Sequence, residues 1–228
     1  MDQSQLRRLG GAAGILFTIL FLIAFFISGD PPGFNASPEQ LADYFADNRG
    51  ELQVTTALLI AAGPLFLLFL AALARVLRIG EGRGPATLSA AAYAGGLIFA
   101  ALILLAVGLL WATSYHGGLE AGAMQGLYDA SNGSFLLAFG IGVTTLVGAT
   151  AAVGLATGTL GRWLSVFGVV LAAYTLVVAI IASFSETGAF NPIDGDLTGI
   201  AVLAFLVWTV WTSIVLIAHA EGEPARTD

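Results

Sequence analysis

Six long apolar segments with no Asp, Glu or Lys in their interiors dominate this chain of 228 residues. A hydrocarbon core of about 30 Å is crossed by about 20 apolar helical residues. Each segment is near that length or longer, and none alternates in polarity like a strand of a membrane barrel. The sequence predicts an all-α fold, a polytopic transmembrane helical bundle with three hairpins in a single membrane domain over residues 1–228. The expected spans cover 11–28, 52–77, 87–114, 135–156, 163–184 and 197–219.

The small share of charged residues excludes several classes of protein. Charged residues are 10% of the chain, against about 25% in soluble domains. A soluble enzyme and a disordered tail are therefore excluded, and a net charge of −7 also argues against nucleic-acid binding. The first span has an alternative interpretation as a signal peptide, but it is long for one and lacks an A-x-A-like cleavage site.

Arginine is distributed asymmetrically between the loops. If the N-terminus is inside, seven arginines fall in inner segments and only Arg49 in an outer one. The positive-inside rule then predicts a multi-pass membrane protein with both termini cytoplasmic. Arginine without lysine, in a chain rich in alanine and glycine, suggests a bacterial source, so we expect the bacterial plasma membrane. The seven inner residues are Arg7, Arg8, Arg75, Arg78, Arg83, Arg162 and Arg226.

The first outer loop contains the signature of a short amphipathic helix. Ser37 suits an N-cap, with Pro38 at the first helical position and Gln40 at the third. The helix has an apolar face and an acidic face, so we expect it at the outer interface, with its aromatic side in the membrane or on the bundle. The acidic face is either solvated, which we favour, or binds a cation such as Ca²⁺. The apolar face consists of Leu41, Tyr44 and Phe45, and the acidic face of Glu39, Asp43 and Asp47.

The second outer loop, about 115–134, repeats this scheme in a weaker form. Met124, Leu127 and Tyr128 share one helical face. His116 and Glu120 are four residues apart and form a conceivable half of a metal site, but two ligands are too few for zinc. We therefore expect neither a metal nor a cofactor.

The interior of the membrane offers no ionisable residue for proton relay or catalysis. Four residues are candidates for a hinge or for a polar path through the membrane. Gly63 and Pro64 interrupt the second span and form either a gating hinge or a packing kink. Thr145 and Tyr174 place hydroxyls in the fourth and fifth spans, where they either line a polar path or bond between helices, which we favour.

Small residues recur along the fourth span at steps of three and four. Such a stripe lets helix backbones approach closely, so we expect this span to be central in the bundle. The stripe consists of Ser134, Ala138, Gly142, Thr145, Ala149, Ala152 and Ala156.

Three motifs carry a resemblance to a family. They are the 37–45 loop, Gly161-Arg162-Trp163-Leu164 with Phe167-Gly168, and Trp208-x-x-Trp211 followed by 213–216. In these the chain resembles a large group of uncharacterised actinobacterial multi-pass integral membrane proteins, whose members often have Pro where Gly161 stands here. The resemblance implies about six spans and brings no assigned activity.

These observations favour an integral membrane protein without recognisable catalytic chemistry, acting as an accessory, scaffold or lipid- or partner-binding subunit. The alternative is a permease or transport subunit for a small or lipophilic substrate. A membrane enzyme ranks third. We expect membrane lipids and a membrane protein or a second copy of the chain as partners, and no nucleic acid.

Overall fold

The computed structural model describes residues 2–29, 31–33, 36–115, 119–185, 188–191 and 195–221. Within these ranges the chain forms helices and no strand, and six helical segments are long and apolar enough to cross a membrane. The chain is thus a multi-pass integral membrane protein with the predicted all-α fold. The helices are α1 (Gln3–Ile27), α2 (Pro38–Asp47), α3 (Arg49–Gly80), α4 (Thr87–Tyr115), α5 (Ala121–Leu137), α6 (Thr144–Thr157), α7 (Arg162–Ala182) and α8 (Asp196–Glu221), with a π-helical segment η1 (Ala138–Val143) between α5 and α6.

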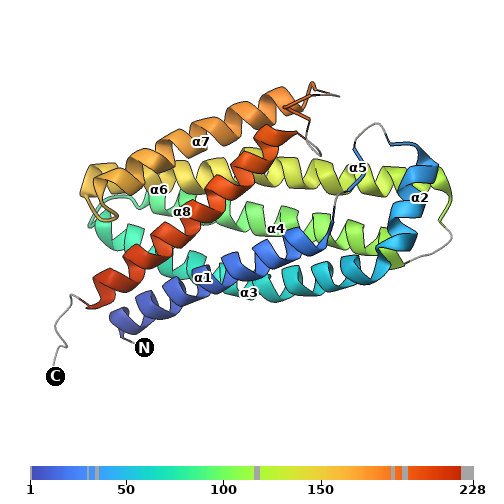
Figure 1. The fold of residues 1–228 in the computed structure, drawn as a ribbon. Helices are drawn as coiled ribbons and strands as arrows, with labels where there is room; N and C mark the ends of the chain where they lie inside the picture. Colours follow the sequence, from blue (N-terminus) through green and yellow to red (C-terminus); the bar gives the residue numbers. More distant parts are fainter. Residues whose placement is uncertain are drawn as a thin grey trace.

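The six spans run antiparallel as three hairpins, so the start of α1 and the end of α8 lie at the same end of the bundle (Figure 1). The α3–α4 and α6–α7 turns lie at this end too, which we call the arginine end. The opposite end carries α2, and we call it the acidic end. Two predicted spans begin too late: the first helix begins at Gln3 instead of 11, and the fourth span begins near Gly122 instead of 135 because α5, η1 and α6 form one continuous segment.

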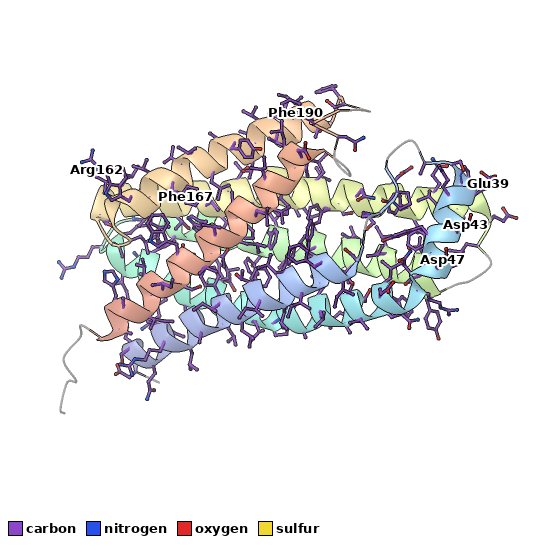
Figure 2. All side chains as sticks on the ribbon, viewed as in Figure 1. Glu39, Asp43, Asp47, Arg162, Phe167 and Phe190 are labelled. Atoms are coloured by element: carbon purple, nitrogen blue, oxygen red, sulfur yellow. The ribbon has the colours of Figure 1, made fainter. Side chains whose placement is uncertain are left out.

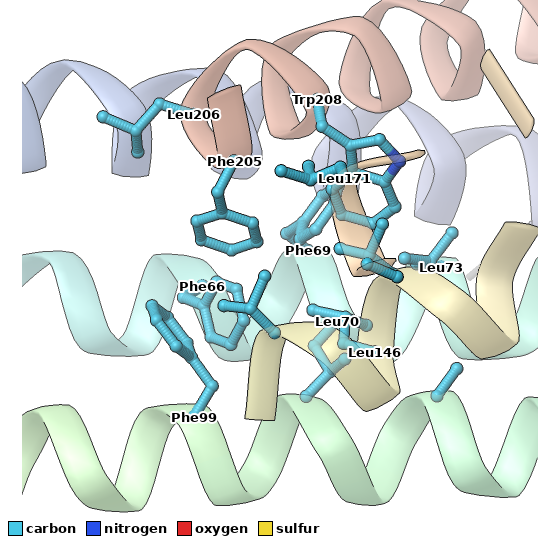
Figure 3. Close-up of a cluster of buried hydrophobic side chains, with 14 of the residues drawn as sticks. Phe66, Phe69, Leu70, Leu73, Phe99, Leu146, Leu171, Phe205, Leu206 and Trp208 are labelled. Carbon is cyan, nitrogen blue, oxygen red and sulfur yellow. The ribbon is translucent and has the colours of Figure 1, made fainter. Parts of the chain in front are cut away.

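Phenylalanine rings fill the middle of the bundle. Phe99 of α4 lies 5.0 Å from Phe66, 5.1 Å from Phe205 and 5.7 Å from Phe139, measured between ring centroids. Phe66 in turn lies 5.0 Å from Phe17 of α1. These tilted and edge-on arrangements are the favoured ones for aromatic pairs. The cluster joins α1, α3, α4, η1 and α8 in one buried core (Figure 3).

Glycines allow the helices around this core to approach closely. A Cβ atom on Gly142 would lie 2.7 Å from the backbone N and Cα of Phe99, and one on Gly95 would lie 2.5 Å from the backbone N of Leu146. Real Cβ atoms do not come so close to backbone atoms, so only glycine fits where α4 crosses the fourth span. This span has the largest buried share of the six, which confirms that it is central.

The π-helical segment changes which residues of the fourth span face the core. A π-type hydrogen bond spans five residues instead of four, so the segment holds one extra residue and rotates the helix that follows. Beyond it the buried residues include Leu146, Thr150 and Val153, and also Ala149 of the predicted stripe. The stripe is therefore correct in part: Thr145 and Ala152 are half-buried and Ala156 is exposed.

The spans differ in length, and the excess lies at the acidic end. At 1.5 Å per residue, the 21 residues of α7 extend about 31 Å, close to the hydrocarbon thickness. The 32 residues of α3 extend about 48 Å on the same scale. Figure 1 shows α3, α4 and α5 continuing beyond α7 and α8, with α2 packed on them. The extra turns support a small structure of their own.

Candidate functional site

The structure at the acidic end, which we call the cap, consists of α2 and the ends of α3, α4 and α5 that it contacts. Its centre is a second apolar cluster, separate from the main core. Leu41 and Phe45 of α2 are 2% and 3% exposed and pack with Leu52, Met124 and Tyr128. The apolar face of α2 therefore lies on the bundle, which decides between the two placements left open by the sequence.

Local sequence explains why α2 forms where it does. The Ser37 hydroxyl accepts from the backbone N–H of Gln40, and the Gln40 side chain accepts from the backbone N–H of Ser37. This reciprocal capping box, with Pro38 at the first position, confirms the predicted start of the helix. Helix α2 then ends at Asp47, where Asn48 donates its side-chain amide to the Tyr44 carbonyl at 2.9 Å.

Two tyrosines hold the cap to the connection between α1 and α2. The Tyr44 hydroxyl donates to the Ser28 carbonyl at 2.7 Å, and the Tyr128 hydroxyl donates to the Pro32 carbonyl at 2.7 Å. Tyr128 also meets Phe45 edge-on, with 5.9 Å between the ring centroids. Each ring thus buries apolar area and satisfies a backbone acceptor. Sequence reasoning placed Tyr128 on a helical face but did not find this role.

The acidic face of α2 points away from the bundle. Glu39, Asp43 and Asp47 are exposed and project from the cap (Figure 2). The Glu39 backbone N–H and the Ser37 hydroxyl hold the pKa of the Glu39 carboxyl below its ordinary value. The cap therefore presents negative charge at neutral pH.

The other predicted features are not gathered in this site. Among the described residues, no group of three His, Asp or Glu side chains could hold a metal. His116 lies outside the described residues. Leu127, predicted to share a face with Met124 and Tyr128, is half-buried.

The four candidates for a hinge or a polar path lie on three different helices. Pro64 of α3 is exposed and Gly63 half-buried, with open space where a Gly63 Cβ would point. Thr145 of α6 is half-buried beside Gly95. The Tyr174 hydroxyl of α7 donates to the Leu197 carbonyl of α8 at 2.9 Å. Tyr174 thus links two helices.

Other hydroxyls also link helices. Thr144 and Thr175 bond through their hydroxyls at 2.9 Å between α6 and α7, and Ser131 of α5 donates to the Ala106 carbonyl of α4 at 2.9 Å. Thr55 of α3 donates to the Ala24 carbonyl of α1 at 3.3 Å. Hydrogen bonds of this kind stabilise helix association in membranes.

Comparison with protein-family models, curated proteins and solved structures finds no match for this chain. The features that bear on its function are the cap, the core and the distribution of charge.

Proposed function

We propose that this protein is a non-enzymatic accessory or scaffold subunit that binds a membrane protein partner through the cap. The observation that carries the proposal is that α2 is docked by a dedicated apolar cluster, with Leu41 and Phe45 buried. Docking fixes the exposed residues of α2 relative to the bundle, and a fixed surface loses less entropy on binding than a mobile one. The partner surface that fits the cap carries positive charge.

Site-specific photocrosslinking tests this proposal. A photoreactive residue at Asp43, on the exposed face of α2, is expected to give a discrete adduct with one protein when irradiated in the native membrane. The matched control carries the same group at Arg83, in an exposed turn at the other end of the bundle. If no protein adduct forms at Asp43, or if the adduct yield is the same at Asp43 and Arg83, the cap has no role in partner binding.

A permease remains the second candidate, and the π-helical segment favours it. Such segments occur often at functional sites, and η1 lies beside the central phenylalanine cluster. Cysteines replacing Thr145 and Tyr174 distinguish the two functions. A scaffold with a packed interior protects both from a membrane-impermeant thiol reagent, whereas a transport path through the bundle allows labelling of both.

We also propose that the acidic end faces the outside of a bacterial plasma membrane. Support comes from the distribution of arginine under the positive-inside rule and from the resemblance to actinobacterial membrane proteins. Cysteines replacing Ala46 on α2 and Arg83 in the α3–α4 turn test the orientation, since both positions are exposed. An impermeant reagent applied to whole cells is expected to label only the Ala46 position; labelling at Arg83 alone reverses the topology.

A further inference from the structure

A set of exposed arginines surrounds the end of the bundle opposite the cap. We call the set the arginine collar and define it as Arg8 near the start of α1, Arg75 in α3, Arg83 in the α3–α4 turn and Arg162 at the start of α7. These segments come together at one end (Figure 1), and Figure 2 shows Arg162 at the opposite end from Glu39, Asp43 and Asp47.

Two of these segments are in direct contact. Gly80, the last residue of α3, packs against the Thr159 hydroxyl of the α6–α7 turn, where an added Cβ would lie 2.5 Å from that oxygen. Arg162 follows Thr159 by three residues, and Arg83 follows Gly80 by three. The fold thus brings together the segments that carry Arg83 and Arg162, which are far apart in the sequence.

Two carboxylates that the structure describes near this end are engaged with backbone or local groups. Asp2 accepts from the Gln3 N–H and the Ser4 hydroxyl. Glu81 accepts from the N–H groups of Leu88 and Ser89, both at 3.1 Å. In the described part of the chain, no carboxylate forms an ion pair with a collar arginine. The collar therefore carries positive charge that the described protein does not compensate.

The collar adjoins surface suited to lipid chains. Leu68, Ala71 and Arg75 follow each other at steps of three and four on the exposed side of α3, so the guanidinium of Arg75 ends an apolar stripe. Next to Arg162, Trp163 is 76% exposed, and exposed tryptophan is typical of the headgroup level. Acyl chains can lie along this surface while their headgroups reach the arginines.

We propose that the arginine collar binds the headgroups of anionic phospholipids in preference to zwitterionic ones. The ligand chemistry is a phosphodiester with net negative charge, which guanidinium groups bind through charge and paired hydrogen bonds. A basic residue at an anionic membrane surface contributes about 1 kcal/mol, which corresponds to roughly a fivefold gain in affinity for each arginine. The inference is independent of the partner that the cap binds.

Native mass spectrometry of the detergent-purified full chain tests the proposal, with phosphatidylglycerol and phosphatidylcholine titrated in parallel. We expect a preference for phosphatidylglycerol of at least about tenfold, since three or four arginines at about fivefold each give more than that before salt screening. The triple variant R75Q/R83Q/R162Q is expected to lose most of the preference. The control variant R49Q changes the arginine at the acidic end and is expected to keep it.

A charge-retaining variant and a competition with inorganic phosphate complete the test. The triple variant R75K/R83K/R162K retains the charge, so we expect it to fold and to keep most of the preference if charge carries the binding. Equal binding of the two lipids by the natural chain overturns the proposal, as does an equal loss in R49Q and the triple glutamine variant. Displacement of phosphatidylglycerol by equimolar inorganic phosphate overturns the assignment to a lipid headgroup.

Discussion

The crossing of α4 and the π-helical segment gives the sharpest quantitative prediction. In G142A the new methyl group meets the backbone N and Cα of Phe99 at 2.7 Å, so no side-chain rotation can relieve the contact and the two helices must separate. Overpacking of a core costs about 1–3 kcal/mol, and we expect the upper part of that range because the neighbouring atoms belong to the backbone.

The matched control is Gly133, which lies in α5 of the same span with open space around its Cβ position. An alanine in a helix interior is about 0.5–1 kcal/mol more favourable than a glycine, so G133A is expected to be neutral or stabilising. The two variants add the same methyl group to one span with opposite expected effects on the free energy of unfolding.

Thermal unfolding in detergent, followed by tryptophan fluorescence, measures the difference. A change of 1 kcal/mol shifts Tm by roughly 2–4 °C in a protein of this size. We therefore expect the Tm of G142A to fall about 5–10 °C below that of the unmodified chain and the Tm of G133A not to fall. A G142A Tm equal to that of G133A would refute the inference that close backbone contact requires glycine at this position.

Three other changes test the cap, the α3–α4 turn and a helix link. F45A removes a buried ring, which lowers the free energy of unfolding by up to about 3–5 kcal/mol and should release α2 from the bundle. Hydrogen exchange of the α2 backbone amides is therefore expected to become faster in F45A, whereas the exposed control D47A leaves it unchanged. The Ser89 hydroxyl and the Leu88 and Ser89 backbone N–H groups hold the pKa of the Glu81 carboxyl below its ordinary 4.5. The contribution of Glu81 to the stability of the folded protein is therefore present above pH 4.5 and lost as the pH falls through the lower pKa of the folded state. Melting curves recorded over this pH range should show a smaller pH dependence in E81Q. Y174F loses the bond to the Leu197 carbonyl and about 1 kcal/mol, whereas Y93F, at an exposed position, should keep the Tm of the unmodified chain.

The parts of the fold that sequence reasoning predicted depend on local physics. A span is recognised by about 20 apolar residues, whichever helices surround it. The start of α2 follows from Ser37, Pro38 and Gln40, which act within one helical turn. For this reason the spans and the short helix were predictable without knowledge of the tertiary structure.

The parts that were missed depend on contacts between distant segments. The fourth span was predicted to begin at 135, and the helix before it was predicted only weakly, because Gly122 and Gly126 lower helix propensity. Both glycines are exposed with open space at the Cβ position, and α5 packs on α4 and α2. The π-helical segment contains Gly142, which packs closely against Phe99 of another helix. No periodicity in the sequence reveals it.

The capping of α4 by Glu81 was missed for a similar reason. Glu81 lies seven residues before Leu88, too far for any helix-capping pattern, and reaches it only because the α3–α4 turn folds back. The hydroxyls of Thr144 and Thr175 were likewise visible in the sequence as polar residues, while their pairing at 2.9 Å needed the packing of α6 on α7.

The extra residue in the π-helical segment sets the rotational phase between the two halves of the fourth span. Each residue of an α-helix advances the azimuth by about 100°. Deleting one residue from Ala138–Val143 would restore the regular α-helical hydrogen-bond pattern and rotate α5 by about 100° relative to α6. Met124 and Tyr128 would then no longer face Phe45. Attachment of the cap is thus determined at a segment about 15 Å along the helix axis from Tyr128, and insertions or deletions that the loops tolerate would be costly in this segment.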